Sequence, residues 1–327
     1  MQSFTALSAL FEEQFNKRHF PQHPRNLYDA SQYILGIGGK RVRPVCVLMG
    51  NELFSDIDPD AFEAANAVEL FHNFSLVHDD IMDKAPLRRG VPTVHMKYGD
   101  ATALLAGDVM LVTAYDYINK IRSSHLNKII ALFNKTAKEV CEGQQMDMEF
   151  EKTDKVSFEA YVEMITLKTS VLLAASMQMG AILGGAGLGN QQHLFEFGKK
   201  LGIAFQVQDD YLDAFGDPAK FGKQPGGDIL ANKKTFLMIH AMEVVSGKQR
   251  DELMLPLKLT AVTQSEKAEK VDKILQIFRD CKVDKWADEL KDKYYQEAMI
   301  HLEDIAVLST RKKELETLAK FLLQREK

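Results

Sequence analysis

The amino-acid sequence predicts an all-α protein, a single-domain helical bundle around a deep central cavity. Apolar residues recur at helical spacing along most of the chain, and no stretch shows the alternation of a strand. Only nine prolines interrupt the 327 residues, and 46% of the residues are hydrophobic, which is enough for a large core. No linker-like stretch divides the chain, so we expect one domain over residues 1–327.

The helices expected in the first half of the chain are bounded by residues that break helical periodicity. Pro21 and Pro24 follow the first periodic segment, and Gly38 and Gly39 end the second. Pro44 opens the third, at a position where a helix tolerates proline. The expected helices are residues 3–18, 26–37, 44–54, 60–84, 101–121 and 126–142.

The second half contains a long uncharged stretch. No residue from Thr169 to Gln192 is charged, and this stretch is long enough to span a bilayer. Ser176 and Gln178 lie inside it, and a glycine cluster begins at Gly184. We therefore expect a buried core helix that ends in a turn, and no membrane span. A polar, glycine-rich loop is expected at 216–228, of the mobile kind that closes active sites. Further helices are expected at 235–246, 249–260, 265–280 and 284–322.

Charge and cysteine content exclude several classes of protein. The net charge is −5 and the isoelectric point is near 6.0, so no basic surface for nucleic acid is expected. Cys46, Cys141 and Cys281 are far apart and odd in number, which favours a reducing compartment over a disulfide framework. Glu12 and Glu13 lie where a signal peptide would be apolar. These features predict a cytoplasmic location.

The first candidate site is an aspartate triplet within the sequence HNFSLVHDDIMDKAPLRRG at residues 72–90. Asp79, Asp80 and Asp83 occupy positions i, i+1 and i+4, so Asp79 and Asp83 share one helix face. Close carboxylates raise one another's pKa unless a cation neutralises them, and hard oxygen ligands suit Mg²⁺. Two consecutive arginines follow the triplet, and arginine is the natural bidentate partner of phosphate.

A second triplet repeats this spacing. Asp209, Asp210 and Asp213 lie within FQVQDDYLDAFGD at residues 205–217. A triplet taken alone is also consistent with a solvated helix face. The apolar surroundings argue against that alternative, because an uncompensated charge in an apolar run is costly. Two triplets facing each other would form a metal cage for a diphosphate.

At these motifs the chain resembles the polyprenyl synthetase family of trans-isoprenyl diphosphate synthases, and the resemblance covers nearly the whole chain. In the family's order, the sequence contains GGKRVRP (38–44), DDIMD followed by RRG, GQQMD (143–147), LKTS (167–170), FQVQDDYLD and GKQPGGDILANKKT (222–235). The resemblance implies the isoprenoid synthase fold and a short-chain enzyme of the farnesyl or geranylgeranyl diphosphate synthase type.

The resemblance also implies roles for individual residues. The implied ligands of two or three Mg²⁺ ions, bound with substrate diphosphate, are Asp79, Asp80, Asp83, Asp209, Asp210 and Asp213. The implied substrate-binding residues are Lys40, Arg43, His72 and Arg89 for isopentenyl diphosphate, and Arg88 for the allylic diphosphate. The implied catalytic residues are Lys168, Thr169, Gln206, Lys223 and Lys233, of which Thr169 and Gln206 stabilise the developing carbocation.

Without the resemblance, several of these positions have plainer explanations. Lys40 and Arg43 could form an ordinary basic turn between two helices, although glycines and cations before a helix also make a sensible anion site. A lone helical histidine such as His72 is more often a core residue than a ligand. Lys168, next to an apolar helix, could simply extend its amine to water.

The reaction implied by the resemblance is the Mg²⁺-dependent head-to-tail (1'-4) condensation of isopentenyl diphosphate with an allylic diphosphate. The allylic partner is dimethylallyl or geranyl diphosphate, with farnesyl diphosphate as a further candidate, and a homodimer is implied. Two alternatives are a non-catalytic regulatory subunit of a prenyl synthase and a terpene cyclase of the same fold. Two intact triplets, together with Lys40 and Arg43, favour the condensing enzyme.

Product length depends on residues just upstream of the first triplet. The growing chain is expected to extend back along the helix from Asp79, and Phe71, Phe74 and Ser75 can form the floor of its pocket. The eight residues from Phe71 to Asp79 rise about 12 Å, roughly the depth of a short prenyl chain. These residues predict a product of fifteen or twenty carbons. The alternative is that both phenylalanines merely fill the core between helices.

Overall fold

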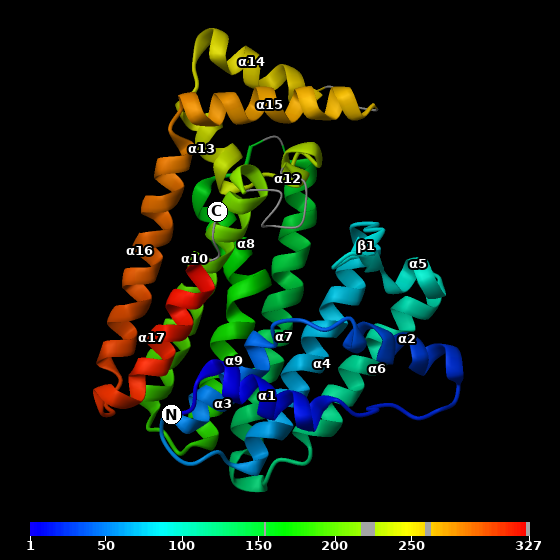
Figure 1. Cartoon of the computed structure of the whole chain (residues 1–327), viewed down its shortest axis with the longest axis vertical. Coiled ribbons are helices and arrows are strands. Elements are labelled where there is room, and N and C mark those ends of the chain that lie inside the picture. The colour runs from blue at the N-terminus through cyan, green and yellow to red at the C-terminus, as the bar shows by residue number, and fades with distance from the viewer. Residues whose placement is uncertain (154, 217–225, 259–262, 325–327) are drawn as a thin grey trace. The chain divides into compact units, whose positions relative to one another are not determined.

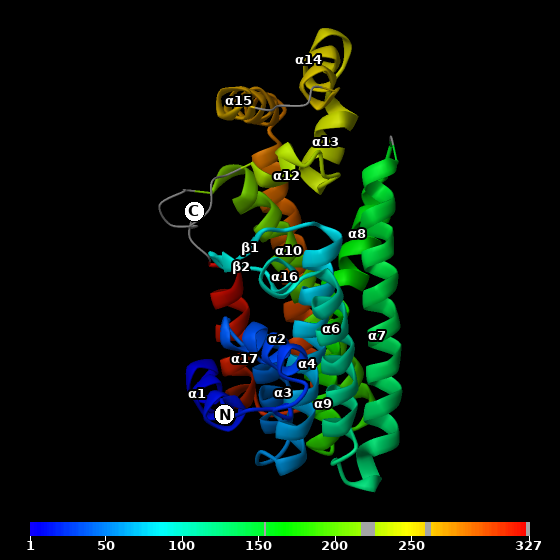
Figure 2. The same cartoon turned by 90° about the vertical axis from the view of Figure 1, so that its right-hand side faces the viewer.

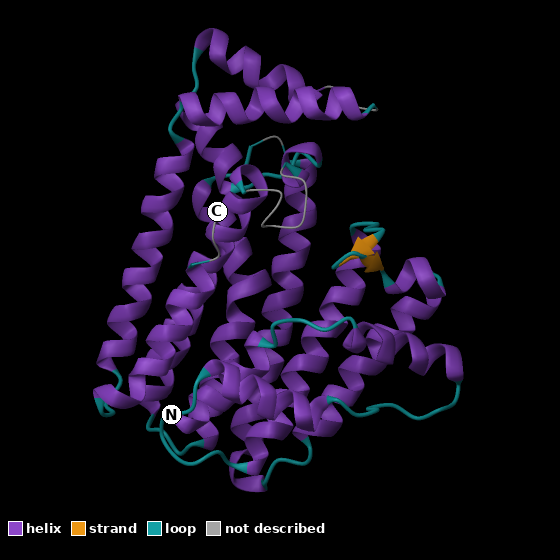
Figure 3. Cartoon of the chain, in the orientation of Figure 1, coloured by secondary structure: helices purple, strands orange, loops and turns teal. Residues whose placement is uncertain are grey.

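The computed structural model describes residues 1–153, 155–216, 226–258 and 263–324. Most of these residues are helical, and within these ranges the strands are limited to one short antiparallel pair (Figure 3). The predicted all-α class is confirmed.

The elements follow one another as in Figure 1. The first are α1 (Phe4–Phe15), α2 (Arg25–Gly36), α3 (Val42–Glu52), α4 (Pro59–Met82), β1 (Leu87–Arg88), β2 (Val91–Pro92), α5 (Val94–Tyr98), α6 (Asp100–Ile118) and α7 (Ser123–Lys152). The others are α8 (Phe158–Ile165), the π-helical turn η1 (Thr166–Ser170), α9 (Val171–Leu183), α10 (Leu188–Phe215), α12 (Gly227–Leu230), α13 (Phe236–Val244), α14 (Gly247–Lys258), α15 (Gln264–Asp280), α16 (Val283–Asp304) and α17 (Ser309–Leu323).

The chain groups into two compact units. Unit 1 comprises Met1–Asn134, Ala175–Phe195 and Ile305–Glu314. Unit 2 comprises Lys135–Ala174, Glu196–Asp304 and Leu315–Lys327. Helices α7, α9, α10 and α17 contribute residues to both units. The single domain expected over residues 1–327 stays a prediction.

Unit 1 is organised around α4, which packs along α6 and also contacts α3 (Figures 1 and 2). Asp58 caps the start of α4 by accepting a hydrogen bond from the Asp60 amide at 2.9 Å, and Pro59 occupies the first turn. Gly107 of α6 permits the close approach of the two helices, because a Cβ there would lie 2.3 Å from Nε2 of His78. This packing fixes the end of α4 that bears the first triplet.

Unit 2 has its own apolar core. Phe236 of α13 and Ile274 of α15 are fully buried, and α13 contacts α8, α15 and α16. Trp286 of α16 lies against this core with its ring 5.6 Å from that of Phe236. The core supports the segments on which the second triplet and its neighbours lie.

Several helix boundaries differ from the sequence prediction. The helix predicted at 126–142 is longer, since α7 continues to Lys152. The helix predicted at 284–322 is two helices, because α16 ends at Asp304 and α17 begins at Ser309. At this break, Oδ1 of Asn190 accepts a hydrogen bond from the backbone amide of Ala306 at 2.9 Å, which replaces a bond within a helix. Most of the loop predicted at 216–228 lies outside the described residues.

Two helical segments are long and apolar enough to span a bilayer by composition alone. They are Asp100–Ile118 and the continuous segment Phe158–Leu183, with mean hydropathies of 1.2 and 1.3. In the second segment, 72% of the most apolar 18-residue window is buried within the protein, as expected for a core helix. It ends at Leu183, shortly before Gly185, whose φ of 75° continues no helix. Such helices are weak evidence for a membrane span, and we assign none.

Candidate active site

The first aspartate triplet closes α4 in unit 1. Asp79 and Asp80 lie in the last turn, and Asp83 is the residue that caps the helix. Asp80 is buried, and both of its carboxylate oxygens accept hydrogen bonds at 2.8 Å, one from Nε and one from Nη2 of Arg88. Asp79 is half-buried and Asp83 is exposed. The triplet therefore contains one buried carboxylate bound by an arginine, one half-buried carboxylate and one exposed carboxylate.

A two-residue hairpin brings Arg88 to Asp80. Strands β1 and β2 pair Arg88 with Val91, which leaves Arg89 and Gly90 as the turn. Both have positive φ, 52° and 80°, as the tight hairpin turn requires. Arg88 thus lies in a short strand. The turn also directs Arg89 to Gly39, where a Cβ would lie only 2.7 Å from Nη1 of Arg89.

The predicted anion-binding residues of unit 1 lie beside this hairpin. Nη1 of Arg43 lies 3.3 Å from Nε2 of His72, and Lys40 is exposed. The pKa of His72 is lowered well below its usual value by burial and by the nearby charges of Arg43 and Arg89. The ring of His72 is therefore neutral and accepts a hydrogen bond from Arg43, which leaves the positive charge on arginine.

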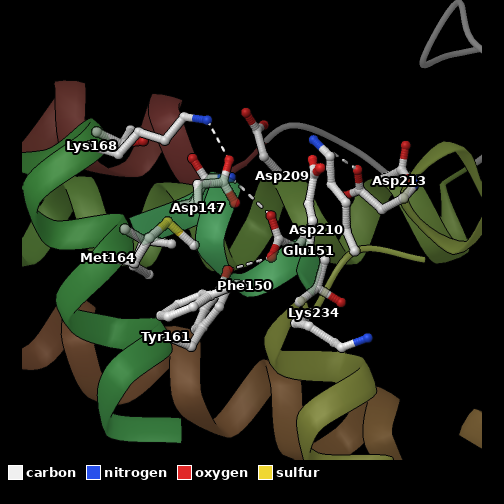
Figure 4. A pocket seen from close by; sticks show the side chains of 16 residues that line it. Asp147, Phe150, Glu151, Tyr161, Met164, Lys168, Asp209, Asp210, Asp213 and Lys234 are labelled. Carbon is white, nitrogen blue, oxygen red and sulfur yellow. Dashed lines mark hydrogen bonds and ion pairs between the residues drawn. The ribbon is translucent and has the colours of Figure 1, made fainter. Parts of the chain in front are cut away.

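The second triplet lines a pocket of about 240 Å³ that lies wholly within unit 2 (Figure 4). The pocket combines carboxylates, lysines and a few apolar side chains. Its lining is Asp147, Phe150, Glu151, Tyr161, Met164, Ile165, Lys168, Thr169, Gln206, Asp209, Asp210, Asp213, Asp228, Lys233, Lys234 and Thr235.

Lys168 enters this pocket from the π-helical turn η1. A π-helical turn is rare, and it often marks a functional site. Gly143 of α7 allows the turn to pack closely, since a Cβ there would lie 2.2 Å from the backbone nitrogen of Lys168. Nζ of Lys168 donates a hydrogen bond to Asp147 at 2.5 Å, as Figure 4 shows. The amine is thus held at the pocket, next to Thr169.

The middle aspartate of the second triplet has neutral hydrogen-bond partners. The hydroxyl of Tyr161 donates to Oδ2 of Asp210, and Nε2 of Gln206 donates to Oδ1 at 2.8 Å. Burial, followed by the charges of Asp228 and Asp209, raises the pKa of Asp210 to about 8. Burial among other carboxylates thus favours the protonated form of Asp210 in the metal-free protein.

The outer members of the second triplet lie at the pocket. Asp209 and Asp213 are half-buried, and Oδ2 of Asp213 accepts a hydrogen bond from the Asp228 amide at 2.9 Å. Asp228 in turn lies 3.6 Å from Nζ of Lys233. The amide link orders the start of α12 against the end of α10 and holds Lys233 near the carboxylates.

The donor set suits a hard cation that is bound together with a ligand. Among the described residues, no three His, Cys, Asp or Glu side chains converge as a ready-made metal cage. Mg²⁺ usually takes only one or two protein carboxylates and completes its shell with water and substrate phosphates. The pair Asp79 and Asp83, and the pair Asp209 and Asp213 at the pocket, fit that requirement.

Comparison with known proteins identifies the family. The sequence profile described as "Polyprenyl synthetase" matches residues 24–278. The chain is 43% identical over 222 residues to the geranylgeranyl diphosphate synthase of Methanosarcina mazei, covering 67% of this chain and 68% of that one. It is 36% identical over 332 residues to the geranylgeranyl diphosphate synthase of Saccharolobus solfataricus, covering 98% of each. This chain belongs to the polyprenyl synthetase family.

Structural comparison agrees with this assignment. The crystal structure of a geranylgeranyl pyrophosphate synthase matches with a TM-score of 0.95 and 40% sequence identity, and the match covers 100% of both chains. The isoprenoid synthase fold expected from the sequence is therefore confirmed.

The predicted site residues of this polyprenyl synthetase fall into two groups. Unit 1 contains Lys40, Arg43, His72, Asp79, Asp80, Asp83, Arg88 and Arg89. The pocket of unit 2 brings together Lys168, Thr169, Gln206, Lys233, Asp209, Asp210 and Asp213. Lys223 lies outside the described residues. The individual roles assigned by resemblance stay predictions.

Some residues at these sites are not predicted from the sequence. Tyr161 precedes Asp210 by 49 residues and belongs to no quoted motif, so no sequence signal connects the two. Phe133 of α7 was likewise not expected. Its ring lies 5.3 Å from that of Phe71, which lies 5.5 Å from that of Phe74. The two phenylalanines of the predicted floor thus belong to one aromatic cluster within unit 1.

Proposed function

We propose that this polyprenyl synthetase condenses isopentenyl diphosphate head-to-tail (1'-4) with an allylic diphosphate and releases an all-trans twenty-carbon prenyl diphosphate and pyrophosphate. The observation on which the proposal rests is the unit 2 pocket, where Lys168 and Lys233 lie with Asp209 and Asp213. A lysine binds phosphate directly, while a pair of carboxylates binds it through a divalent cation. Both are needed for a diphosphate that leaves as an anion.

Mg²⁺ is the proposed cofactor, in two or three ions that bind together with the substrate diphosphate. Asp79 and Asp83 would hold it in unit 1, and Asp209 and Asp213 in unit 2. When bound, the metal supplies positive charge that stabilises the leaving diphosphate. Asp80 is already bound by Arg88 through both oxygens, so its proposed role is to hold that arginine in place.

The residues of unit 2 act on the allylic substrate. Lys168 and Lys233 bind the diphosphate and stabilise its charge as the carbon–oxygen bond breaks. Lys223 is proposed to join them. Thr169 and Gln206 present oxygen atoms near the allylic cation, and the apolar lining, including Met164, helps to keep out water that would capture it. The pocket offers no obvious general base, and the released diphosphate is the proposed proton acceptor.

A separate set of residues in unit 1 is proposed to bind isopentenyl diphosphate. Lys40, Arg43 and His72 hold its diphosphate, with Arg89 beside them. Because His72 accepts a hydrogen bond from Arg43, it orients that guanidinium toward the anion and adds no charge of its own. The double bond of isopentenyl diphosphate then attacks the allylic cation, and a proton is lost from the adduct.

Product length is the finer part of the proposal. Phe71 and Phe74 form the floor of the chain pocket with Ser75, and Phe133 supports them. Phe71 is 1% exposed, so its ring is held firmly enough to stop a growing chain. A relative that matches nearly the full length of this chain is named geranylgeranyl diphosphate synthase, which supports a twenty-carbon product.

A homodimer is proposed from the exposed apolar face of α6. Leu104, Leu105 and Val112 are 50%, 54% and 62% exposed. A row of large apolar side chains on one helix is typical of a surface that another chain covers. A cytoplasmic location is proposed because Cys46, Cys141 and Cys281 are odd in number and far apart in the sequence, which favours a reducing compartment over a disulfide framework.

The test is incubation with isopentenyl diphosphate, an allylic primer and Mg²⁺, with pyrophosphate release and product length as readouts. We expect release only when both substrates are present, and a twenty-carbon product. Release from the primer alone would indicate a cyclase. A folded protein without release under any condition would indicate a regulatory subunit, and either result would overturn the proposal.

A further inference from the structure

The segment GGKRVRP (38–44), which leads into the first turn of α3, contains three cations, and one of them does not face solvent. Lys40 is exposed and Arg43 is half-buried, whereas Arg41 is buried. The guanidinium of Arg41 forms an ion pair with Oε1 of Glu69, and its Nη2 donates a hydrogen bond to the carbonyl of Leu35 at 2.9 Å. Both terminal nitrogens of Arg41 are therefore engaged within unit 1, which leaves ligand binding to its neighbours.

Glu69 connects this arginine to α4. It is 3% exposed, and its Oε1 also accepts a hydrogen bond from Nδ2 of Asn73 at 3.0 Å. His72 follows Glu69 by three residues, almost one helical turn. The ion pair thus joins the loop before α3 to the turn of α4 that presents His72.

The backbone at Arg41 needs such support. Its φ of 51° lies in the left-handed region, which is strained for a residue with a side chain. Such a conformation persists only when surrounding contacts hold it. Arg41 is also the residue that caps the start of α3, and the Val45 amide donates to its carbonyl at 3.1 Å. Arg43 lies in the following turn, so the conformation of Arg41 decides where Arg43 points.

We propose that Arg41 and Glu69 are positioning residues that hold Lys40, Arg43 and His72 in the arrangement that binds the diphosphate of isopentenyl diphosphate. This inference rests on the proposed function of that site. A buried ion pair stabilises a fold no better than a well-packed apolar pair of similar volume. Its specific contribution here is geometric, because it fixes the loop and α4 in one register.

The proposal is tested with the double variant Arg41→Met/Glu69→Leu, which replaces the ion pair with apolar side chains. Steady-state kinetics should show KM for isopentenyl diphosphate raised about tenfold or more, with KM for the allylic primer and kcat within about threefold of wild type. Thermal unfolding measures whether the fold is retained. Wild-type KM for isopentenyl diphosphate in this folded variant would overturn the proposal, as would equal increases in both KM values.

A second variant covers the case in which the double variant does not fold. Glu69→Gln keeps the shape of the side chain but removes the charge that opposes Arg41, and it should raise KM for isopentenyl diphosphate about threefold or more. An unchanged value would overturn the proposal. The matched control Lys200→Met/Glu297→Leu removes a half-exposed ion pair of unit 2 and should leave both KM values at wild type.

The variant Arg43→Ala separates this inference from the proposed function. If Arg43→Ala leaves KM for isopentenyl diphosphate unchanged, the assignment of the diphosphate site itself fails. If Arg43→Ala raises that KM while the Arg41 and Glu69 variants do not, only the positioning role fails.

Discussion

The two aspartate triplets share one spacing, but their middle residues are stabilised in opposite ways. In the first, Asp80 is a buried carboxylate whose two oxygens both accept hydrogen bonds from the guanidinium of Arg88. In the second, Asp210 is also buried, but it accepts hydrogen bonds from the hydroxyl of Tyr161 and the side-chain amide of Gln206. The first carboxylate is compensated by a charge and the second by neutral donors.

This difference changes the charge of the two sites. Asp210 is buried near the carboxylates of Asp228 and Asp209, and hydrogen bonds from neutral donors only partly offset the cost of a charge there. The pKa of Asp210 therefore rises to about 8. Around the first triplet, four arginines of unit 1 lie close enough to lower the pKa of His72. The surroundings of the first triplet in unit 1 are therefore rich in cations, whereas Asp210 of the second triplet lies near other carboxylates of unit 2. A repeated sequence motif thus does not imply two equivalent sites.

The largest effect is expected from the outer carboxylates and from the metal they would hold. Removal of divalent cations with a chelator should abolish turnover, and added Mg²⁺ should restore it. Asp79→Ala and Asp209→Ala should each lower kcat by about 10³-fold or more, because the leaving diphosphate loses its counter-charge. Pyrophosphate release measures the rate, and circular dichroism checks the fold. A wild-type rate in either variant would refute the metal-binding role proposed for that aspartate.

The next largest effect on kinetics is expected from variants that distinguish the two proposed diphosphate sites. Lys168→Ala should lower kcat about 10²-fold by slowing ionisation of the allylic primer, with a small change in KM for isopentenyl diphosphate. Arg43→Ala and His72→Ala should do the reverse, raising that KM more than the KM for the primer. Initial rates with each substrate varied in turn provide the comparison. If all three variants affect both substrates alike, the two diphosphate sites are not separate.

A contact between two side chains can be predicted from the sequence only when the two residues lie close together in the chain. Arg88 follows Asp80 by eight residues within a quoted motif, so an arginine beside the first triplet could be predicted. Tyr161 lies in another helix, 49 residues before Asp210, and only packing brings the two together. The same limit applies to Glu69, which is 28 residues from Arg41. Helical class and most helices follow from periodicity, which is local.

Boundaries that depend on long-range contacts were predicted less well. The break between α16 and α17 is stabilised by Asn190, which is 116 residues from Ala306. The π-helical turn at Lys168 packs closely against Gly143 of α7, 25 residues earlier in the chain. Neither feature leaves a local pattern in the sequence.

A smaller effect on rate, but a change in product, is expected from the aromatic cluster of unit 1. Phe71→Ala/Phe74→Ala removes two rings that contact each other at 5.5 Å. The variant should lose several kcal/mol of stability, about 3–5 kcal/mol of it from the fully buried ring of Phe71, and make longer products. Mass spectrometry of the products measures chain length. A matched Phe11→Ala variant, which removes a buried ring from α1, should keep the wild-type product. An unchanged product in a folded double variant would mean that these rings only fill the core.

The central claim is that Asp80 has a charged partner and Asp210 has neutral partners. It is tested most directly with the variants Asp80→Asn and Asp210→Asn, whose free energies of unfolding are measured without metal at pH 8 and pH 5. Asp80→Asn removes the anionic partner of Arg88 and should lower stability by about 1–3 kcal/mol. In the wild type, the folded state retains the Asp210 proton that the unfolded state releases, so Asp210 costs stability as pH rises from about 4 to about 8.

Asparagine does not titrate in this pH range, so the variant lacks this pH-dependent loss of stability. Asp210→Asn should therefore be more stable than wild type at pH 8, by on the order of 1 kcal/mol, with a smaller difference at pH 5. The structure thus predicts changes of opposite sign for the two variants at pH 8. Two changes of the same sign, or a gain for Asp210→Asn that does not depend on pH, would contradict the assignment of a charged partner to one triplet and neutral partners to the other.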